Sequence, residues 1–572
     1  MKAIKKFLGL MMVAVLSLGV LGSFAGCNKD DYGCVHPRFT TLYVSSYSSV
    51  YNSVWLDEVI KRFEEDYKDY VMSETGMVGV KVIPEDMDIV GADVLDGMSD
   101  NESHVIFTED VNYYDFVSQG YCLDLTQMLS EPLTEYGETR SIKDKISDTV
   151  WEAMEYGADK KVYMVPHYAG YNGITLDIDL MDKEKLFLGE DGKFAYQESN
   201  KAPTTYTGRP DPENSTYLSA GQDGKFGTYD DGLPATYEEF FELMEKLSKV
   251  ATPIVWSGEE NHYVTQMLSS MAVSGMGAND AEGFYAYNKN NVSVVKTDTI
   301  SVDASQPTWN LSYQTETVNL TEATGYEVFR TPGFLTALNF IDMIVENGYY
   351  AKASFTDGVT HNDAQLEFLL SSLDTEAFEK PYAMLVDGCW WEQEAAQIFM
   401  DLDDYYGDCG RMDRRLRFLP FPQIDEAHIG SGQVLFESSN AYGFVNANTP
   451  ESYRELALAF LQYCNTDVSL REFSVVTSTP KALDYELTAE DKAKMSYFGR
   501  SLLDIQTAPD TKIVYSMANN ATFKAKKGAL GTKDIWVMNA TTKTPLVYFK
   551  ENKTNSAKDY FISMYNNWKA NW

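Results

Sequence analysis

The sequence predicts an α/β protein with more than one lobe. Short apolar strands alternate with amphipathic helices over most of the 572 residues, and no repeat of fixed period interrupts this order. The length is enough for two to four domains, and 44% hydrophobic residues supply large cores. The opening order of strand, polar loop and amphipathic helix is typical of a doubly wound lobe, in which ligands sit at the carboxyl ends of the strands.

The first elements show this order. Residues Thr41 to Val44 predict a buried strand, and the Ser-rich stretch Ser45 to Ser49 predicts a loop. A helix is expected from about Ser53, because apolar residues then recur at four-residue intervals on one face: Trp55, Val59, Phe63 and Tyr67. Two further strands are expected at Val80 to Ile83 and at Val105 to Phe107.

Later helices have recognisable ends. Thr236 and Glu239 form the pattern of a capping box. Thr449 and Pro450 suit the N-cap and first turn of another helix, and Gly348 suits the end of a third. Residues 188–233 and 285–330 are rich in loop-forming residues, the second with a hairpin pattern, and we interpret both as insertions decorating one lobe.

The N-terminus predicts secretion and a lipid anchor. Three lysines, an apolar run from Phe7 to Leu21 and a small-residue stretch ending at Cys27 have the layout of a signal peptide over residues 1–26. The Ala-Gly-Cys ending resembles a bacterial lipobox, whose Cys thiol receives a diacylglycerol and becomes the mature N-terminus. Residues 27–38 then form a polar spacer. The expected location is the extracellular face of the bacterial cell membrane, although an ordinary cleavage site beside a cysteine would give the same pattern.

Composition excludes several function classes. The net charge of −38 and the pI near 4.5 leave no basic footprint, so nucleic-acid binding is not expected. The other cysteines are irregularly spaced without a CxxC pair, which indicates neither a disulfide framework nor a zinc site. No HExxH, GxSxG or GxxxxGK[ST] motif is present.

An ordered set of segments resembles a known family. The most specific is Ala383 to Trp390, an Ala-Met strand followed by Gly and an aromatic residue. The others, in chain order, are Leu42 to Tyr67, Val105 to Tyr114, Phe116 to Leu125, Val162 to Tyr168, Pro234 to Phe240, Leu419 to Pro422, Tyr442 to Val445 and the helix from Glu455 to Cys464. Together they resemble the extracellular solute-binding proteins of bacterial ABC sugar importers, the family to which maltose-binding protein belongs.

The resemblance implies a periplasmic-binding-protein-like fold of two lobes that close by a hinge around a central ligand cleft. By analogy, lobe one holds residues 39–166 and 438–490, and lobe two holds residues 167–437 and 491–572. The implied function is capture of a carbohydrate, most naturally an oligosaccharide, and its delivery to the membrane permease of an ABC transporter. We expect a monomer that needs no cofactor and is not an enzyme.

Aromatic side chains are the first candidates for sugar contact, since a sugar ring offers an apolar face for stacking. Trp390 stands where the family places a sugar-stacking Trp. Trp391 is its neighbour, and strand alternation is expected to place only one of the pair in the cleft and the other in the packed core. Trp256, Tyr168 and Tyr171 follow strands and suit either the cleft or plain packing under a loop.

Polar candidates follow the first and third strands. Glu109 and Asp110 lie where carboxylates could accept hydrogen bonds from sugar hydroxyls, although lone carboxylates in an acidic chain are usually solvated. Ser45, Tyr47 and Trp55 lie at the first strand-to-helix turn and complete the candidate ligand-binding set.

The segment Gly221 to Gly232 is a candidate calcium loop. Its carboxylates Asp223, Asp230 and Asp231 are interleaved with glycines, so side-chain and backbone oxygens could surround a hard cation. The spacing differs from an EF-hand, and a turn-rich loop without metal explains the pattern equally well.

Two other classes stay open. A surface glycoside hydrolase would need two carboxylates about 5 to 9.5 Å apart across a cleft, and in a chain with 85 Asp and Glu the sequence alone does not test this. A peptide-binding lipoprotein would share the anchor but has no positive signal of its own.

Overall fold

The computed structural model describes residues 39–47, 53–198, 217–303, 309–531, 535–536, 544–551 and 556–572. The predicted signal segment, Cys27 and the spacer lie outside these ranges. No helix within them combines the length and apolarity needed to cross a bilayer.

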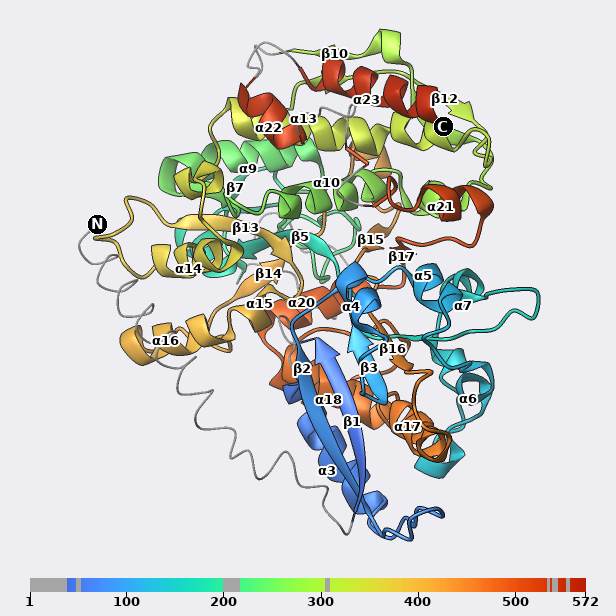
Figure 1. Ribbon diagram of the computed structural model, residues 1–572. Helices are drawn as coiled ribbons and strands as arrows, with labels where there is room; N and C mark the ends of the chain where they lie inside the picture. The colour runs from blue at the N-terminus through green and yellow to red at the C-terminus, as the bar shows by residue number, and fades with distance from the viewer. Residues whose placement is uncertain are drawn as a thin grey trace.

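A five-stranded mixed sheet forms the centre of the lower lobe in Figure 1. Its order is β2-β1-β3-β16-β4, with β1 parallel to β2 and β3, and with β16 antiparallel to β3 and β4. The bounds are β1 Thr40–Tyr47, β2 Val80–Met87, β3 Val105–Thr108, β4 Val165–Pro166 and β16 Tyr442–Val445. The three strands expected near the N-terminus are therefore confirmed.

Helices from both ends of the sequence complete this lobe. The amphipathic helix α3 packs on the sheet through Val59, Ile60 and Phe63, and α17 contacts both α3 and β16. The helices here are α3 Asp57–Asp66, α4 Gly91–Gly97, α5 Tyr113–Ser118, α6 Thr126–Ser130, α7 Asp148–Met154, α17 Glu451–Tyr463, α18 Asp467–Thr477 and α19 Ala489–Lys494.

The expected loop after β1 begins too early. Ser45, Ser46 and Tyr47 belong to the strand, because β1 is an interior strand that pairs with β2 through Tyr47 and with β3 at Ser45 and Ser46. The buried hydroxyls of Ser45 and Ser103 lie 2.6 Å apart in a hydrogen bond, which satisfies both polar groups.

A second sheet, of order β14-β5-β13-β8, lies at the centre of the upper lobe (Figure 1). Here β5 is antiparallel to β13 and β14, whereas β8 runs parallel to β13. The bounds are β5 Asn172–Asp177, β8 Thr252–Val255, β13 Tyr382–Gly388 and β14 Leu416–Phe418.

Helices cover this sheet, and the C-terminal helices α22 and α23 pack on α13. The helices of the upper lobe are α8 Ile178–Glu184, α9 Tyr237–Val250, α10 His262–Ser274, α11 Ala278–Ala281, α12 Gly283–Ala286, α13 Pro332–Glu346, α14 His361–Ser371, α15 Trp391–Glu394, α16 Ala396–Tyr406, α20 Tyr497–Gln506, α21 Ala521–Lys526, α22 Pro545–Glu551 and α23 Ala557–Asn571.

The predicted helix ends are close to those observed. Thr236 caps α9 by accepting the backbone N–H of Glu239, and the Glu239 carboxylate accepts the N–H of Ala235 at 2.7 Å. The helix α17 has Pro450 rather than Thr449 as its N-cap. Gly348 follows α13 with a φ of 66°, which explains why glycine stands there.

Short antiparallel pairs occupy the two predicted insertions. The strands β6 Phe187–Leu188 and β7 Phe194–Tyr196 form one pair. The second insertion holds β9 Val292–Val295 paired with β12 Thr315–Val318, and β10 Ser301–Val302 paired with β11 Leu311–Ser312. The expected hairpin pattern in the second insertion is confirmed.

The chain passes between the lobes in segments that lie side by side. One joins β4 to β5, and a second joins β15 Gln433–Glu437 to β16. Tyr171 of the first segment bridges to Glu437 at the start of the second, and Tyr168 bridges to Lys481, which follows α18. The strand β15 also pairs in parallel with β17 Thr511–Tyr515.

Candidate ligand site between the lobes

Trp390 lies where the last residues of β13 meet the segment that joins the lobes. A Cβ atom on Gly388 would lie 2.3 Å from its indole ring, so this glycine makes room for the ring. A Cβ atom on Gly170 would lie 3.2 Å from the indole, but would first clash with the Ser439 hydroxyl at 1.6 Å. The indole also lies beside the hydroxyl of Tyr263, in the first turn of α10. Trp390 is 9% exposed. Only a small part of its ring is therefore open to a ligand in this state.

The strand-alternation argument for Trp390 and Trp391 is wrong. The strand β13 ends at Gly388, so Trp390 is the N-cap of the short helix α15 and Trp391 is its first residue. Trp391 is nevertheless fully buried, in contact with Phe368, Phe399 and Phe498. It lies in the core of lobe two, which is the upper lobe in Figure 1, whereas lobe one is the lower lobe.

Two carboxyl groups converge beside Trp390. Asp387 precedes Gly388 in β13, and Glu394 lies in α15. The Nε2 atom of Gln365, in α14, donates to Asp387 Oδ2 and to Glu394 Oε2, each at 3.0 Å. Burial, together with the repulsion between the two carboxyl groups, raises the pKa of Glu394 well above its usual range. Burial also raises the pKa of Asp387.

Further acidic groups surround this pair. The carboxylates of Glu260, from lobe two, and of Glu109, at the carboxyl end of β3 in lobe one, both repel Glu394 and add to the rise of its pKa. Glu260 Oε2 lies 2.7 Å from His361 Nδ1 and accepts the backbone N–H of His361 at 2.6 Å. Burial disfavours the charge on Glu260, but these bonds outweigh it and lower its pKa. The site therefore draws acidic groups from both lobes.

The remaining polar candidates are Asp110, Ser45 and Tyr47, and each has its own neighbours. Asp110 is exposed in a left-handed conformation, with φ 53°, and its N–H donates to the carbonyl of Ser439 in the joining segment. It lines a separate cavity of about 160 Å³ together with Asn440 and Tyr285. Ser45 is buried inside the lower lobe and Tyr47 is partly buried at the end of β1.

The remaining aromatic candidates are core residues in this state. Trp256 is buried against Tyr350 and Phe355. Trp55 is buried against Phe107, and its Nε1 donates to Ser46 Oγ at 3.2 Å. Tyr168 and Tyr171 are buried where the joining segments meet. Ligand contact by any of these four stays a prediction.

Sequence reasoning missed five residues of the site: Gln365, Asp387, Glu394, Glu260 and Tyr263. Asp387 lay inside the quoted segment Ala383 to Trp390, directly before Gly388, so its position at the end of a buried strand was a usable signal. The other four come from the loop before α10, from the first turn of α10, from α14 and from the short helix α15, and nothing in their local sequence distinguishes them.

A second titratable group lies among the joining segments. Lys481 is buried with its Nζ 2.5 Å from His167 Nδ1, and its ammonium position lies 4.3 Å from the ring centre of Phe473 and 4.6 Å from that of Trp55. Burial lowers the pKa of Lys481 to about 7. Nearby, burial raises the pKa of Glu437 to about 7, although Glu437 Oε1 accepts backbone N–H groups from Gly170 and Ser439.

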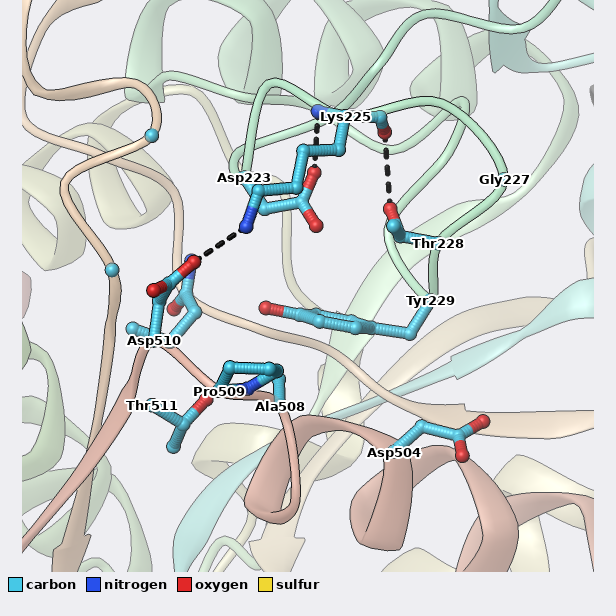
Figure 2. Close-up of a pocket in the computed structure, with 13 residues that line it drawn as sticks. Asp223, Lys225, Gly227, Thr228, Tyr229, Asp504, Ala508, Pro509, Asp510 and Thr511 are labelled. Atoms are coloured by element: carbon cyan, nitrogen blue, oxygen red, sulfur yellow. Dashed lines mark hydrogen bonds and ion pairs between the residues drawn. The ribbon is translucent and has the colours of Figure 1, made fainter. Parts of the chain in front are cut away.

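The predicted calcium loop forms one wall of a cavity of about 490 Å³ on lobe two (Figure 2). Tyr229 extends between the loop and the segment Ala508 to Asp510, and Lys225 Nζ pairs with Asp510 at 2.5 Å across the cavity.

The carboxylates of this loop bind its own backbone. Asp230 Oδ2 accepts the N–H of Asp223 at 2.8 Å, and Asp231 accepts the N–H groups of Gly227 and Thr228. Across the described ranges, no group of three or more His, Cys, Asp or Glu side chains is arranged to hold a metal ion. The structural calcium stays a prediction.

Comparisons with known proteins bear on the fold. No protein-family model and no curated protein matches the sequence. Three solved structures are similar in fold. A chitin oligosaccharide binding protein is 15% identical with a TM-score of 0.51, and the match covers 93% of this chain and 98% of that one. A protein from a study of xylan utilization by Caldanaerobius polysaccharolyticus is 13% identical with a TM-score of 0.51, covering 92% of this chain and 99% of that one. Apo RafE from Streptococcus pneumoniae is 13% identical with a TM-score of 0.50, covering 93% of this chain and 98% of that one. The α/β fold predicted from the resemblance is confirmed along nearly the whole chain.

Proposed function

We propose that this protein is a lipid-anchored extracellular solute-binding protein that captures a carbohydrate between its lobes and delivers it to the permease of an ABC transporter. The observation that carries the proposal is the site beside Trp390, where an indole edge, the Tyr263 hydroxyl and carboxyl groups from both lobes converge. Aromatic rings beside polar groups suit a sugar, which has an apolar face and a rim of hydroxyls.

The small exposure of Trp390 fits a protein that binds by lobe movement. In this state the lobes are close enough for Glu109 of lobe one to repel Glu394 of lobe two. Opening at the joining segments would uncover the Trp390 ring and separate these charges, and a sugar that bridges the lobes would favour the closed state.

A thermal-shift screen of the mature protein against a panel of oligosaccharides tests the proposal. A ligand at 100 times its Kd adds about 2.7 kcal/mol to stability, which is readily detected. Titration calorimetry of each hit then gives the affinity. The proposal fails if no glycan in a panel of neutral, amino and acidic oligosaccharides shifts the melting temperature.

The same hits discriminate the enzyme hypothesis. Asp387 and Glu394 share the amide of Gln365, and because Asp387 is almost completely buried in this state, a ligand or a substrate would reach it only when the lobes open. Incubation of each bound oligosaccharide with the protein, followed by chromatography, should return it intact. Cleavage products would favour a surface glycoside hydrolase, and hits among peptides alone would favour a peptide-binding lipoprotein.

Anchor, membrane location and monomeric state belong to the same proposal. They rest on the lipobox-like end at Cys27 and on the family resemblance. Two or more acyl chains would hold the protein on the membrane, because each buried methylene contributes about 0.8 kcal/mol.

A further inference from the structure

Hydrogen-bond acceptors outnumber donors beside Trp390. Asp387 Oδ2 and Glu394 Oε2 share one donor atom, Nε2 of Gln365, and Asp387 Oδ1 accepts the N–H of Gly388 at 2.7 Å. An ionised carboxylate and an amide oxygen only accept, and a protonated Glu394, which its raised pKa implies, adds a single donor, so a ligand that completes this group must bring N–H or O–H donors.

One acceptor in the group has no donor at all. Gln365 is fully buried, and within the described part of the chain its Oε1 accepts no hydrogen bond. Buried polar atoms are normally satisfied, so an exception calls for a partner, which can be a water or a ligand group. The amide oxygen of Gln365, whose nitrogen binds the two carboxyl groups, therefore lacks a hydrogen-bond donor among the described residues.

The group also lacks a Lys or Arg partner. No Lys or Arg side chain of the described residues pairs with Asp387 or Glu394, and His361, whose charge acts on Asp387, is bound to Glu260. Glu109 and Glu260 add further negative potential. Closely spaced carboxyl groups away from water favour a positive partner.

We propose that Asp387, Glu394 and Gln365 form a subsite for the ammonium group of an amino sugar, so that the protein prefers glycans with a free amine. This inference rests on the proposed capture of carbohydrate between the lobes. An ammonium group supplies three donors and a positive charge, whereas a hydroxyl supplies one donor and an N-acetyl group supplies one N–H without charge. A sugar carboxylate brings only acceptors and like charge, and is rejected.

Polyamines and peptide lysines carry the same ammonium chemistry. The sugar is the expected source because the exposed edge of Trp390 lies beside the subsite and offers a surface for a pyranose ring. The test therefore includes both kinds of amine.

Titration calorimetry on the mature protein at pH 7 would compare the β-1,4 trimers of glucosamine, N-acetylglucosamine and glucose, the matching glucuronate trimer, spermidine and a Lys-containing tripeptide. We expect the glucosamine trimer to bind at least tenfold more tightly than the other trimers. Equal or tighter binding of the N-acetyl, glucose or glucuronate trimer overturns the inference, as does failure of every amine to bind at millimolar concentration. Binding of spermidine or the tripeptide without any glycan would leave an amine subsite but refute the proposed carbohydrate function.

Two variants make the test specific to the subsite. Glu394→Gln should remove the preference for the free amine, while Glu392→Gln should keep it. Glu392 is a good control because it lies in the same short helix, is buried, and binds Ser496 Oγ at 2.5 Å instead of Gln365. Loss of the preference in Glu392→Gln alone, or its survival in Glu394→Gln, would contradict the assignment.

Discussion

Ionisation of Glu437 should lower the free energy of unfolding of this protein as the pH rises from 4.5 to about 7. Its carboxyl group is 4% exposed at the point where the joining segments meet, and burial raises its pKa from the ordinary 4.5 to about 7. Between these values the folded chain binds a proton that the unfolded chain has lost, so the free energy of unfolding decreases as pH rises. Below pH 4.5 there is no loss, and above pH 7 the loss is complete.

The magnitude follows from the two pKa values. At 1.36 kcal/mol for each pH unit, the difference between 4.5 and 7 corresponds to about 3 kcal/mol. Glu437→Gln keeps an oxygen that can accept the N–H groups of Gly170 and Ser439 but never ionises. The variant should therefore match wild type at pH 4.5 and exceed its stability by about 3 kcal/mol at pH 8.

Urea unfolding at pH 4.5, 5.5, 6.5, 7.5 and 8.5 measures this difference. Glu490→Gln is the control, because its side chain is 80% exposed and its removal should have a small effect that does not change with pH in this way. A Glu437→Gln curve that stays parallel to wild type from pH 4.5 to 8.5 would refute the reasoning, as would a gain that appears only at low pH.

Trp390→Phe should weaken sugar binding at least tenfold with a modest loss of stability. Trp391→Phe should bind sugar normally and melt at a lower temperature, because Trp391 is fully buried. Titration calorimetry and thermal melting of both variants test this, and the reverse pattern would transfer the stacking role to Trp391. In wild type, burial of Lys481 should make stability rise between pH 7 and 9, since the unfolded chain keeps a proton there that the folded chain loses, and Lys481→Met should abolish that rise in urea unfolding. Chelation with EGTA should lower the melting temperature and Asp230→Ala should remove that sensitivity; an unchanged wild-type melt would exclude a structural calcium. Cys27→Ala should leave the protein unprocessed or release it to the medium, and a mature-sized chain retained on the membrane would contradict the lipid anchor.

The fold was predictable because its signals are local. Apolar runs marked β1, β2 and β3, and four-residue spacing marked the helix that contains Phe63. Errors were confined to ends, such as the extension of β1 through Tyr47, where pairing with two neighbouring strands overrides the turn preference of serine. Which strands share a sheet is a long-range property, and the return of β16 to β3 came only from the family resemblance.

The site was less predictable because burial is decided by tertiary packing. Trp256 and Trp391 have the residue type and position expected of sugar-stacking groups, but both are enclosed by aromatic neighbours that are distant in sequence. Trp390 differs from Trp391 by one position, and its ring packs close to Gly170, which lies 220 residues earlier in the chain. Adjacent aromatic residues therefore take different roles for reasons that no sequence window contains.

The same reasoning explains why carboxylates were poor guides in this acidic chain. Among 85 Asp and Glu, what distinguishes Asp387 and Glu394 is that both meet the one amide of Gln365. Gln365 lies on a different element and carries no charge, so no count of acidic residues would have selected it. A buried neutral side chain that holds two acids and leaves its own oxygen unsatisfied is a more specific sign of a ligand than any of the acids alone.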